Sequence, residues 1–305
     1  MLDIELIEGE YDTESWLKAV RGFENEPEKG ARCAICFDRR FEVTAEKAYE
    51  LKENYFTSTL LTSPKKSLKQ LKTAGDALGK KFNIEFIAPD YRKASGTQEQ
   101  NILAKRDALY RQDYCGCLFG LTMQREQQQK LADELFSPLS QQIQPESIEA
   151  RLELYRERLA YEEQGVAYKI VKERFLNWRE LYGYVKVKKE TLPSHFLPYS
   201  TLKSEFSRGK VDVKVGELHY MNRDEIKFVT LETYNRVADT NYQSVTELIY
   251  NPPSLKIELN VRSNLINNSY DVSSIIVVDT IPTQKLEIRY KSHIYEDVKE
   301  VLVKI

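Results

Sequence analysis

The sequence contains no run of about 18 or more apolar residues, so no segment is expected to span a lipid bilayer. Its N-terminus, MLDIELIEGE, is acidic and lacks the basic start and apolar core of a signal peptide. No fixed-period repeat is present, which argues against solenoid and propeller folds. These absences favour a soluble, cytoplasmic protein with no membrane partner.

Histidine is scarce, and a strong excess of charge of either sign is absent. The three histidines, His195, His219 and His293, lie far apart without acidic or thiol partners at metal-ligand spacing. We therefore expect them to be ordinary surface or packing residues. The chain has 45 Lys and Arg against 47 Asp and Glu, a formal net charge of −2. This balance excludes a uniformly basic nucleic-acid binder, although local basic patches can still contact phosphates.

Cysteine is rare as well, but its placement is informative. The four cysteines form a C-x-x-C pair, Cys33 and Cys36, and a C-x-C pair, Cys115 and Cys117, about 80 residues further on. In a cytoplasmic chain they are not expected to form a disulfide framework. Four thiolates can complete a zinc site or hold an iron–sulfur cluster. Alternatively, the second pair can close a short, easily reduced disulfide suited to electron transfer. The spacing alone leaves these alternatives open.

Cations surround both cysteine pairs. Arg32 and Arg40 flank the first pair and Arg111 precedes the second. Cations near thiolates lower their pKa and attract anionic substrates or electron-rich clusters. Gly116 separates the second pair, where it would impose the least steric restriction on a tight turn.

A basic segment lies between the two pairs. Residues 62–93 contain eight Lys or Arg and three acidic residues, a pattern that can contact RNA phosphates or simply form a solvated helix face. Hydroxyl side chains precede this segment, where they can bind a phosphate or cap a helix. The candidate phosphate-binding residues are Arg32, Arg40, Thr57, Ser58, Thr59, Ser63 and Lys66.

Hydrophobic periodicity divides the 305 residues into three parts. Residues 1–122 alternate expected strands with expected helices, which favours a parallel α/β layer. The strands are expected at 2–7, 55–61 and 84–88, and the helices at 13–20, 34–51, 63–79 and 98–108. Residues 123–192 are expected to be a helical connector, strongly helical over 146–182.

Residues 193–305 are expected to form a mostly antiparallel β domain, because short apolar–polar alternating runs dominate there. The expected strands are 210–215, 226–231, 245–250, 255–261, 274–278, 285–290 and 301–305. Nothing in this part forms a catalytic constellation.

Several ordered motifs lie within residues 1–120. The first is Gly22-Phe23-Glu24-Asn25-Glu26-Pro27, followed by Gly30-Ala31-Arg32-Cys33-Ala34-Ile35-Cys36-Phe37, Arg40 and Thr44-Ala45. The next are Phe56-Thr57-Ser58-Thr59-Leu60, Ser63-Pro64-x-Lys66 and Asp90-Tyr91-Arg92. The most specific motif is Tyr110-Arg111-Gln112-Asp113-Tyr114-Cys115-Gly116-Cys117. In this order the motifs resemble the QueH-type epoxyqueuosine reductase family.

The resemblance implies a Rossmann-like α/β layer and a cobalamin-independent reduction of epoxyqueuosine to queuosine at the wobble position of tRNA. It implies that Cys33 and Cys36 help to hold a [4Fe-4S] cluster. Cys115 and Cys117 would form a redox-active pair or bind a second iron site. The partners would be the anticodon region of tRNA and an electron donor that the sequence does not specify.

Three neighbours of the second pair, Arg111, Asp113 and Tyr114, are candidates for proton delivery and orientation, or else turn and packing residues. The family also begins with a strand that ends in an adjacent Cys-Cys motif supplying further cluster ligands. This sequence has no Cys-Cys, so we expect an N-terminally truncated, incomplete layer.

Two other functions compete with the reductase. In a zinc-stabilised RNA-binding or interaction module, the four thiolates would hold one structural metal and transfer no electrons. A nucleotide-binding tRNA thiolation enzyme would need a Gly/Ser-rich phosphate loop after the first strand, and the sequence contains none.

Overall fold

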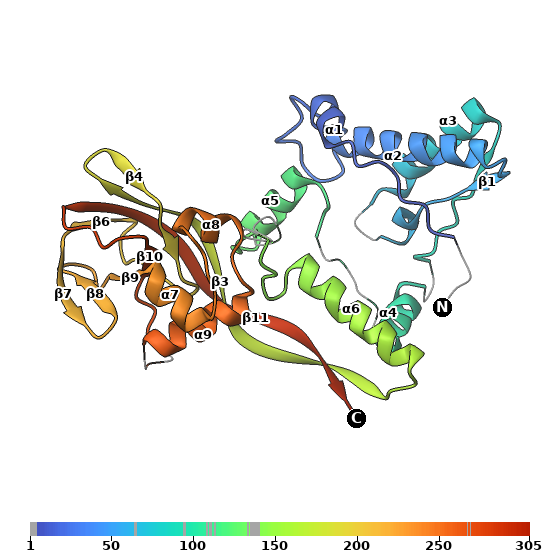
Figure 1. The fold of residues 1–305 in the computed structure, drawn as a ribbon. Coiled ribbons are helices and arrows are strands. Elements are labelled where there is room, and N and C mark those ends of the chain that lie inside the picture. Colours follow the sequence, from blue (N-terminus) through green and yellow to red (C-terminus); the bar gives the residue numbers. More distant parts are fainter. Residues whose placement is uncertain are drawn as a thin grey trace. The chain divides into compact units, whose positions relative to one another are not determined.

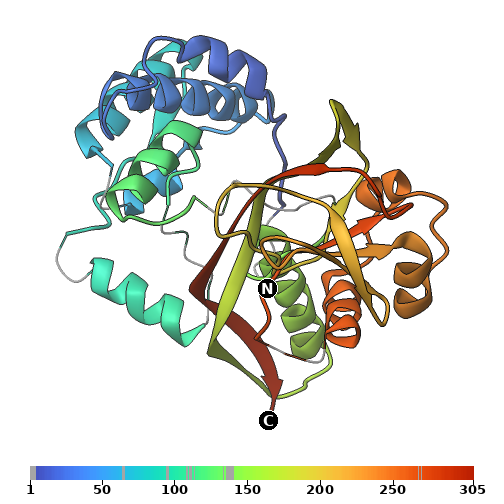
Figure 2. The same ribbon diagram turned by 90° about the vertical axis from the view of Figure 1, so that its left-hand side faces the viewer.

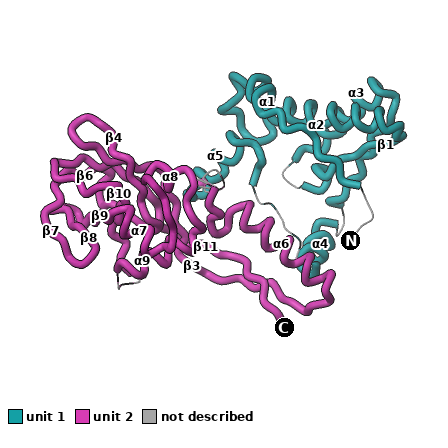
Figure 3. The backbone as a smooth tube through the Cα atoms, viewed as in Figure 1, with its two compact units in different colours: residues 1–131 teal, residues 132–305 magenta. Residues whose placement is uncertain are grey.

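The computed structural model describes residues 5–63, 66–93, 96–107, 109, 112, 114–132, 134, 141–266, 268 and 270–305. Two of the candidate site residues, Arg111 and Asp113, lie outside these, as does half of the segment predicted as the first strand, residues 2–4 of 2–7. The chain forms two compact units, Met1–Leu131 and Ala132–Ile305 (Figure 3). This division differs from the three-part division expected from the sequence, because most of the predicted connector falls in the second unit.

The first unit is built from helices around a short parallel strand pair (Figure 1). Helices lie close to all four positions expected from periodicity, while the strands expected at 55–61 and 84–88 are only two residues each. The elements are α1 (Thr13–Ala19), α2 (Ala31–Glu50), β1 (Tyr55–Phe56), η1 (Thr59–Thr62), α3 (Leu68–Phe82), β2 (Glu85–Phe86), α4 (Gly96–Arg106) and α5 (Leu118–Gln127).

The core of the first unit forms where α2 and α3 pack against β1 and β2. Phe41 of α2 lies 5.2 Å from Phe86 of β2, measured between ring centroids, and Phe56 of β1 lies 4.9 Å from the same ring. A side chain at Gly75 of α3 would collide with Phe86, since a Cβ there would lie 2.1 Å from the ring. These contacts fix α2, which carries the first cysteine pair. The Rossmann-like layer implied by the resemblance remains a prediction.

The second unit contains two sheets and four helices in the described residues. One sheet has the strand order β5-β10-β9-β8-β7 and the other β4-β3-β11-β6; β9 and β10 are parallel and the other pairings antiparallel. The elements are α6 (Ile148–Glu163), β3 (Tyr168–Val187), β4 (Glu190–Leu192), β5 (His195–Phe196), β6 (Phe206–Gly209), β7 (Val211–Val215), β8 (Leu218–Met221), β9 (Lys227–Thr230), α7 (Leu231–Ala238), α8 (Val245–Tyr250), α9 (Leu255–Leu265), β10 (Ile275–Val278) and β11 (Leu286–Lys304).

Two apolar clusters hold the second unit in three layers. The first joins the two sheets, with Val185 and Ile288 of the four-stranded sheet packed among residues such as Phe228 and Ile276 of the five-stranded sheet. The second cluster lies on the other face of the five-stranded sheet, which α7, α8 and α9 cover. The four-stranded sheet is therefore an outer layer, with one face in the core and one face outside it.

The longest element is a two-stranded ribbon in which β3 pairs with β11 along almost the full length of both strands (Figure 2). The helix predicted over 146–182 is correct for α6 but wrong from Tyr168 onward. Its apolar residues at helical spacing instead belong to a strand whose partner lies more than 100 residues later in the chain. No local signal reveals that pairing.

Two predicted strands, 245–250 and 255–261, are helices α8 and α9. The Ser244 side chain accepts a hydrogen bond from the backbone N–H of Glu247, and the Glu247 carboxylate accepts one from that of Gln243. This capping geometry starts the helix despite β-branched residues. The described helices include none that is both long and apolar enough to cross a membrane.

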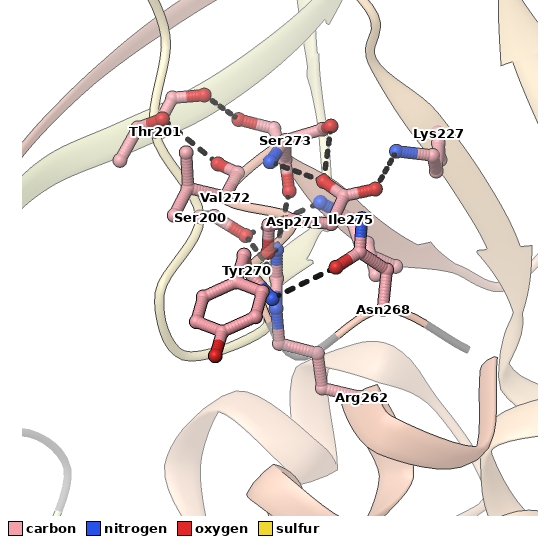
Figure 4. Close-up of polar contacts among 11 residues, drawn as sticks. Ser200, Thr201, Lys227, Arg262, Asn268, Tyr270, Asp271, Val272, Ser273 and Ile275 are labelled. Carbon is pink, nitrogen blue, oxygen red and sulfur yellow. Dashed lines mark hydrogen bonds and ion pairs between the residues drawn. The ribbon is translucent and has the colours of Figure 1, made fainter. Parts of the chain in front are cut away.

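A polar network pins the loop before β10 to the sheet (Figure 4). Asp271 pairs with Lys227 at 3.0 Å, and the buried Arg262 donates to the backbone carbonyls of Asp271 and Ser273, both at 2.8 Å. Burial lowers the pKa of Arg262, and the negative charge of Asp271 opposes this effect. The hydrogen bonds of the buried guanidinium hold the loop in place. We assign it a structural role.

Candidate functional site

The first cysteine pair lies at the start of α2. Cys33 is 8% exposed, and its sulfur accepts a hydrogen bond from the backbone N–H of Lys29 at 3.3 Å. Cys36 lies three residues on, on the same face of the helix. Burial raises the pKa of Cys36, while the charge of Arg40 and a hydrogen bond from Trp16 oppose this rise.

The second pair lies just before α5, whose N-cap is Cys117. The side-chain oxygen of Gln124 accepts a hydrogen bond from the backbone N–H of Cys115 at 2.9 Å. A hydrogen bond between the two sulfurs lowers the pKa of Cys115 to about 5, and the same bond, together with burial, raises the pKa of Cys117. The two thiols therefore titrate as one coupled pair, in which one sulfur loses its proton more readily than a free cysteine does.

Helix α5 brings the second pair to the first. The ring of Phe119 stacks on Trp16 of α1, with the centroids 6.1 Å apart, and the Arg32 guanidinium lies 5.7 Å from the Phe119 ring centroid. Gln124 also donates to the Glu28 carboxylate at 3.2 Å. The charges of Cys115 and Cys33 both contribute to raising the pKa of Cys36, so sulfurs of the two pairs lie close enough to interact electrostatically. Two pairs far apart in sequence thus share one site.

The donor set at this site suits a soft metal or an iron–sulfur cluster, because it consists of four thiols, all free. Within the described residues, no three Cys, His, Asp or Glu side chains are already arranged around one metal position. The site therefore provides ligands of the right chemistry without a fixed coordination shell.

The structure gives Arg32 a different role from the phosphate contact that the sequence suggests. Its side chain is 2% exposed and donates to the backbone carbonyls of Phe23 and Glu24, at 3.1 and 2.5 Å. A guanidinium so enclosed cannot reach a phosphate in solvent. Its charge instead lowers the pKa of Cys117, against the larger raising effects described above. Arg40, in contrast, is exposed and remains a candidate for contacting the substrate.

The hydroxyl-rich loop after β1 already makes hydrogen bonds within the first unit. The Thr57 hydroxyl donates to the Ile87 carbonyl at 2.8 Å, and the Ser58 hydroxyl caps η1 by accepting from the Leu60 N–H at 3.2 Å. The backbone carbonyls of Thr59 and Ser63 accept from Thr62 and Arg92. These contacts favour the capping interpretation over phosphate binding.

Four of the eight cations of the basic segment have acidic partners, one of them Arg92 with Asp90. Lys66 pairs with Glu28 at 3.3 Å, Lys72 with Asp76 and Lys81 with Glu42. Lys66 lies close enough to the second cysteine pair for its charge to lower the pKa of Cys115. Lys66 therefore acts electrostatically on Cys115, and its predicted contact with a phosphate stays a prediction.

Among the candidates for proton delivery, Tyr114 lies beside the second pair, and its ring contacts the Arg125 guanidinium, 5.8 Å from the centroid. Sequence reasoning missed four residues that shape the site, namely Trp16, Glu28, Phe119 and Gln124. Gln124 stands in the polar stretch that we expected to begin a connector. Nothing local distinguishes these residues, because each acts across a distance in sequence.

Gly120 provides the close approach that the second pair requires. A Cβ at this position would lie 3.2 Å from both the Cβ and the sulfur of Cys115. At Gly116 the nearest atom would be 3.9 Å away and the backbone φ is outside the left-handed region, so the tight turn does not depend on glycine there.

We predict that Gly120→Ala displaces Cys115, weakens the sulfur–sulfur hydrogen bond and moves the pH midpoint of Cys115 alkylation upward by at least about one unit. Alkylation with iodoacetamide across pH, mapped by mass spectrometry, measures this. Alanine is the better helix former by about 1 kcal/mol, so loss of helix α5 cannot explain the shift. Gly116→Ala is the matched control and should leave the midpoint unchanged; an equal shift in both variants would contradict the prediction.

Comparison with known proteins places this site in a family. A family model described as "Epoxyqueuosine reductase QueH" matches residues 1–123. The epoxyqueuosine reductase QueH of Helicobacter pylori is 35% identical over 314 residues, which cover 97% of this chain and 84% of that protein. The chain belongs to the QueH family.

Other QueH proteins match a shorter part of the chain. The enzymes of Streptococcus pyogenes and Acinetobacter baylyi are 36% and 38% identical, over 40% and 39% of this chain and 48% and 55% of their own lengths. QueH relatives are named as reductases, so the chain belongs to a family of oxidoreductases. The second unit lies outside the matched family region and is shared with the Helicobacter relative.

One solved structure, an aminopeptidase from Aneurinibacillus, is 9% identical and matches 54% of this chain and 45% of its own with a TM-score of 0.29. That score is too low to define a shared fold.

Proposed function

We propose that this chain reduces epoxyqueuosine to queuosine at the wobble position of tRNA. The family membership supports the reaction, and the observation that carries it to particular residues is the convergence of the two cysteine pairs at one site.

In the proposed reaction Cys115 and Cys117 supply two electrons. The thiolate and the thiol become a disulfide, the epoxide oxygen leaves as water, and the two ring carbons become an alkene. One proton comes from Cys117 and the second from solvent, so that atoms and electrons balance. An external electron donor then reduces the disulfide and restores the pair. Tyr114 and the exposed Arg40 are the described candidates for orienting the substrate.

Cys33 and Cys36 would hold a [4Fe-4S] cluster beside this pair, which supplies an electron store and a Lewis-acidic iron when bound. Around it the chain's own groups keep the thiols in place. The Lys29 N–H donates to Cys33 and the Trp16 indole donates to Cys36. Hydrogen bonds to sulfur are among the main means by which proteins tune such clusters.

Anaerobic iron–sulfur reconstitution tests the metal assignment first. We expect broad visible absorbance, with iron and sulfide each bound at about four per chain. Zinc without iron would support the alternative of a zinc-stabilised RNA-binding module, which is colourless.

A direct assay tests the reaction. Reconstituted protein, a chemical reductant and tRNA carrying epoxyqueuosine are incubated, and the nucleosides are separated by mass spectrometry. Conversion to queuosine is the expected result; an intact cluster with no conversion would contradict the proposed function.

A further inference from the structure

The outer face of the four-stranded sheet in the second unit carries aromatic and basic side chains side by side. The pairing register of the strands fixes which residues share this face. One row is Tyr184, Arg289 and Phe206, and the next is Lys186, Glu287 and Arg208. A third row pairs Tyr182 with Lys291. We call these eight residues the aromatic–basic face.

Alternation along the strands confirms that this face points away from the core. Val185, Leu286, Ile288 and Tyr290 are fully buried, and they occupy the intervening positions of β3 and β11. On β6, Ser207 is 2% exposed, whereas Phe206 is 41% exposed. Packing of the inner face thus leaves Phe206, Arg208 and Arg289 exposed, while Tyr184, Lys186 and Lys291 are half-buried.

The rings and cations of this face are arranged together. Lys186 lies over the ring of Tyr184, 5.0 Å from its centroid, and Arg289 lies 5.3 Å from the centroid of Phe206. Cations held beside aromatic rings are available both to stacked bases and to their phosphates.

The aromatic–basic face carries more positive than negative charge, which favours binding of an anion. Its four cations, Lys186, Arg208, Arg289 and Lys291, face a single carboxylate within the rows, Glu287, which pairs with Arg208 at 3.2 Å. Glu205 at the edge pairs with Lys291 at 2.6 Å. The chain as a whole has a net charge of −2, so this concentration of cations is local.

We propose that the aromatic–basic face binds single-stranded RNA, with bases stacking on Tyr184 and Phe206 and phosphates meeting Lys186 and Arg289. The inference rests on the proposed function for its partner, the tRNA substrate, whose unpaired nucleotides provide such a strand. A sheet that presents two or three exposed rings among cations is a common way to bind unpaired bases without strict sequence preference.

Fluorescence anisotropy with a labelled single-stranded RNA of about twelve nucleotides tests this binding on the full chain. The double variant Tyr184→Ala/Phe206→Ala should bind at least about tenfold more weakly. Arg289→Gln should weaken binding and flatten the salt dependence by about 0.7 in the logarithmic slope. Tyr184→Phe, which keeps the ring, should bind the RNA as tightly as the unaltered chain does. If the double variant does not fold, the comparison of Arg289→Gln with Tyr184→Phe tests the face.

Two exposed tyrosines elsewhere in the same unit provide controls. Tyr270 is 92% exposed and Tyr250 70% exposed, and replacing either by alanine should leave RNA binding unchanged. No binding by the unaltered chain, equal binding by the double variant, or equal loss in the controls would each overturn the inference.

The assay needs neither turnover nor reductant, so its outcome is separable from that of the proposed function. If the unaltered chain reduces epoxyqueuosine and the face variants bind RNA as tightly as it does, this inference alone is wrong. RNA binding at this face without reduction would leave the inference standing and remove the reductase.

Discussion

Replacing Cys115 by serine is expected to reduce the rate of epoxyqueuosine reduction by at least about a thousandfold, because serine cannot form the disulfide that supplies two electrons. We expect the same variant to retain iron and sulfide after reconstitution, since the proposed cluster ligands are Cys33 and Cys36. Cys33→Ser, by contrast, should lose both activity and iron. The rate of tRNA-bound queuosine formation and the iron content of each variant are the measurements.

Thr122→Ser is the matched control on α5, because it removes one methyl group and keeps the hydroxyl that donates to the Leu118 carbonyl at 2.9 Å. It should remain active. If Cys115→Ser loses iron as completely as Cys33→Ser does, Cys115 is a metal ligand and the redox-pair assignment is wrong.

Replacing Glu258 by glutamine is expected to invert the pKa shift of His195. Glu258 is 1% exposed; its carboxylate contacts His195 and accepts from Tyr234 at 3.3 Å and from Gln142 at 2.6 Å. Burial alone lowers the pKa of His195, but attraction to Glu258 and the hydrogen bond with it raise the pKa above 6.5. Without the carboxylate, burial dominates and the pKa should fall below 6.5.

The sign of the pH dependence follows from these two directions. In the unaltered chain, protonated His195 stabilises the fold fully below pH 6.5, and this contribution is lost as pH rises through the folded-state pKa. In the variant the buried imidazole opposes folding as it becomes charged. We expect Glu258→Gln to cost about 3–5 kcal/mol at acidic pH, where His195 is charged, and less above neutrality.

Urea unfolding at several pH values measures the cost, and NMR titration of the imidazoles measures the pKa. The chain has three histidines, so the His195 signals can be assigned by substitution. Glu180 must be followed as well, because burial raises its pKa to about 6 and the charge of His195 lowers it in part. Glu232→Gln, an exposed carboxylate of α7, is the control. A variant in which His195 still titrates above 6.5 would refute the assignment of Glu258 as its partner.

Local patterns identified four α-helices of the first unit, α1 to α4, but not α5, which follows the second cysteine pair. The helix expected over 34–51 corresponds to α2, whose buried residues include Phe37, Phe41, Ala45 and Ala48. Sequence patterns failed where a partner lies far along the chain. Residues 168–182 have apolar spacing that suits a helix, but pairing with β11 makes them a strand. Tertiary contacts override a weak local preference.

One wrong prediction, the strand at 245–250, could have been avoided from the local sequence. The sequence Ser244-Val245-Thr246-Glu247 has the capping-box pattern, which predicts a helix start, and we weighted its β-branched residues instead. The site shows the same division. Cysteine spacing and family motifs predicted the two pairs, whereas Gln124, Phe119 and the His195–Glu258 pair depend on contacts between distant segments.

The two units differ in how far along the chain their core residues lie. The core residues of the first unit lie between Cys33 and Phe86, so that core can form while later residues are still being translated. In the second unit, β11 pairs with β3 and β6 and contributes Leu286, Ile288 and Tyr290 to the core. Until β11 is synthesised, the edge of β3 that it pairs with is open and the core of the second unit is incomplete.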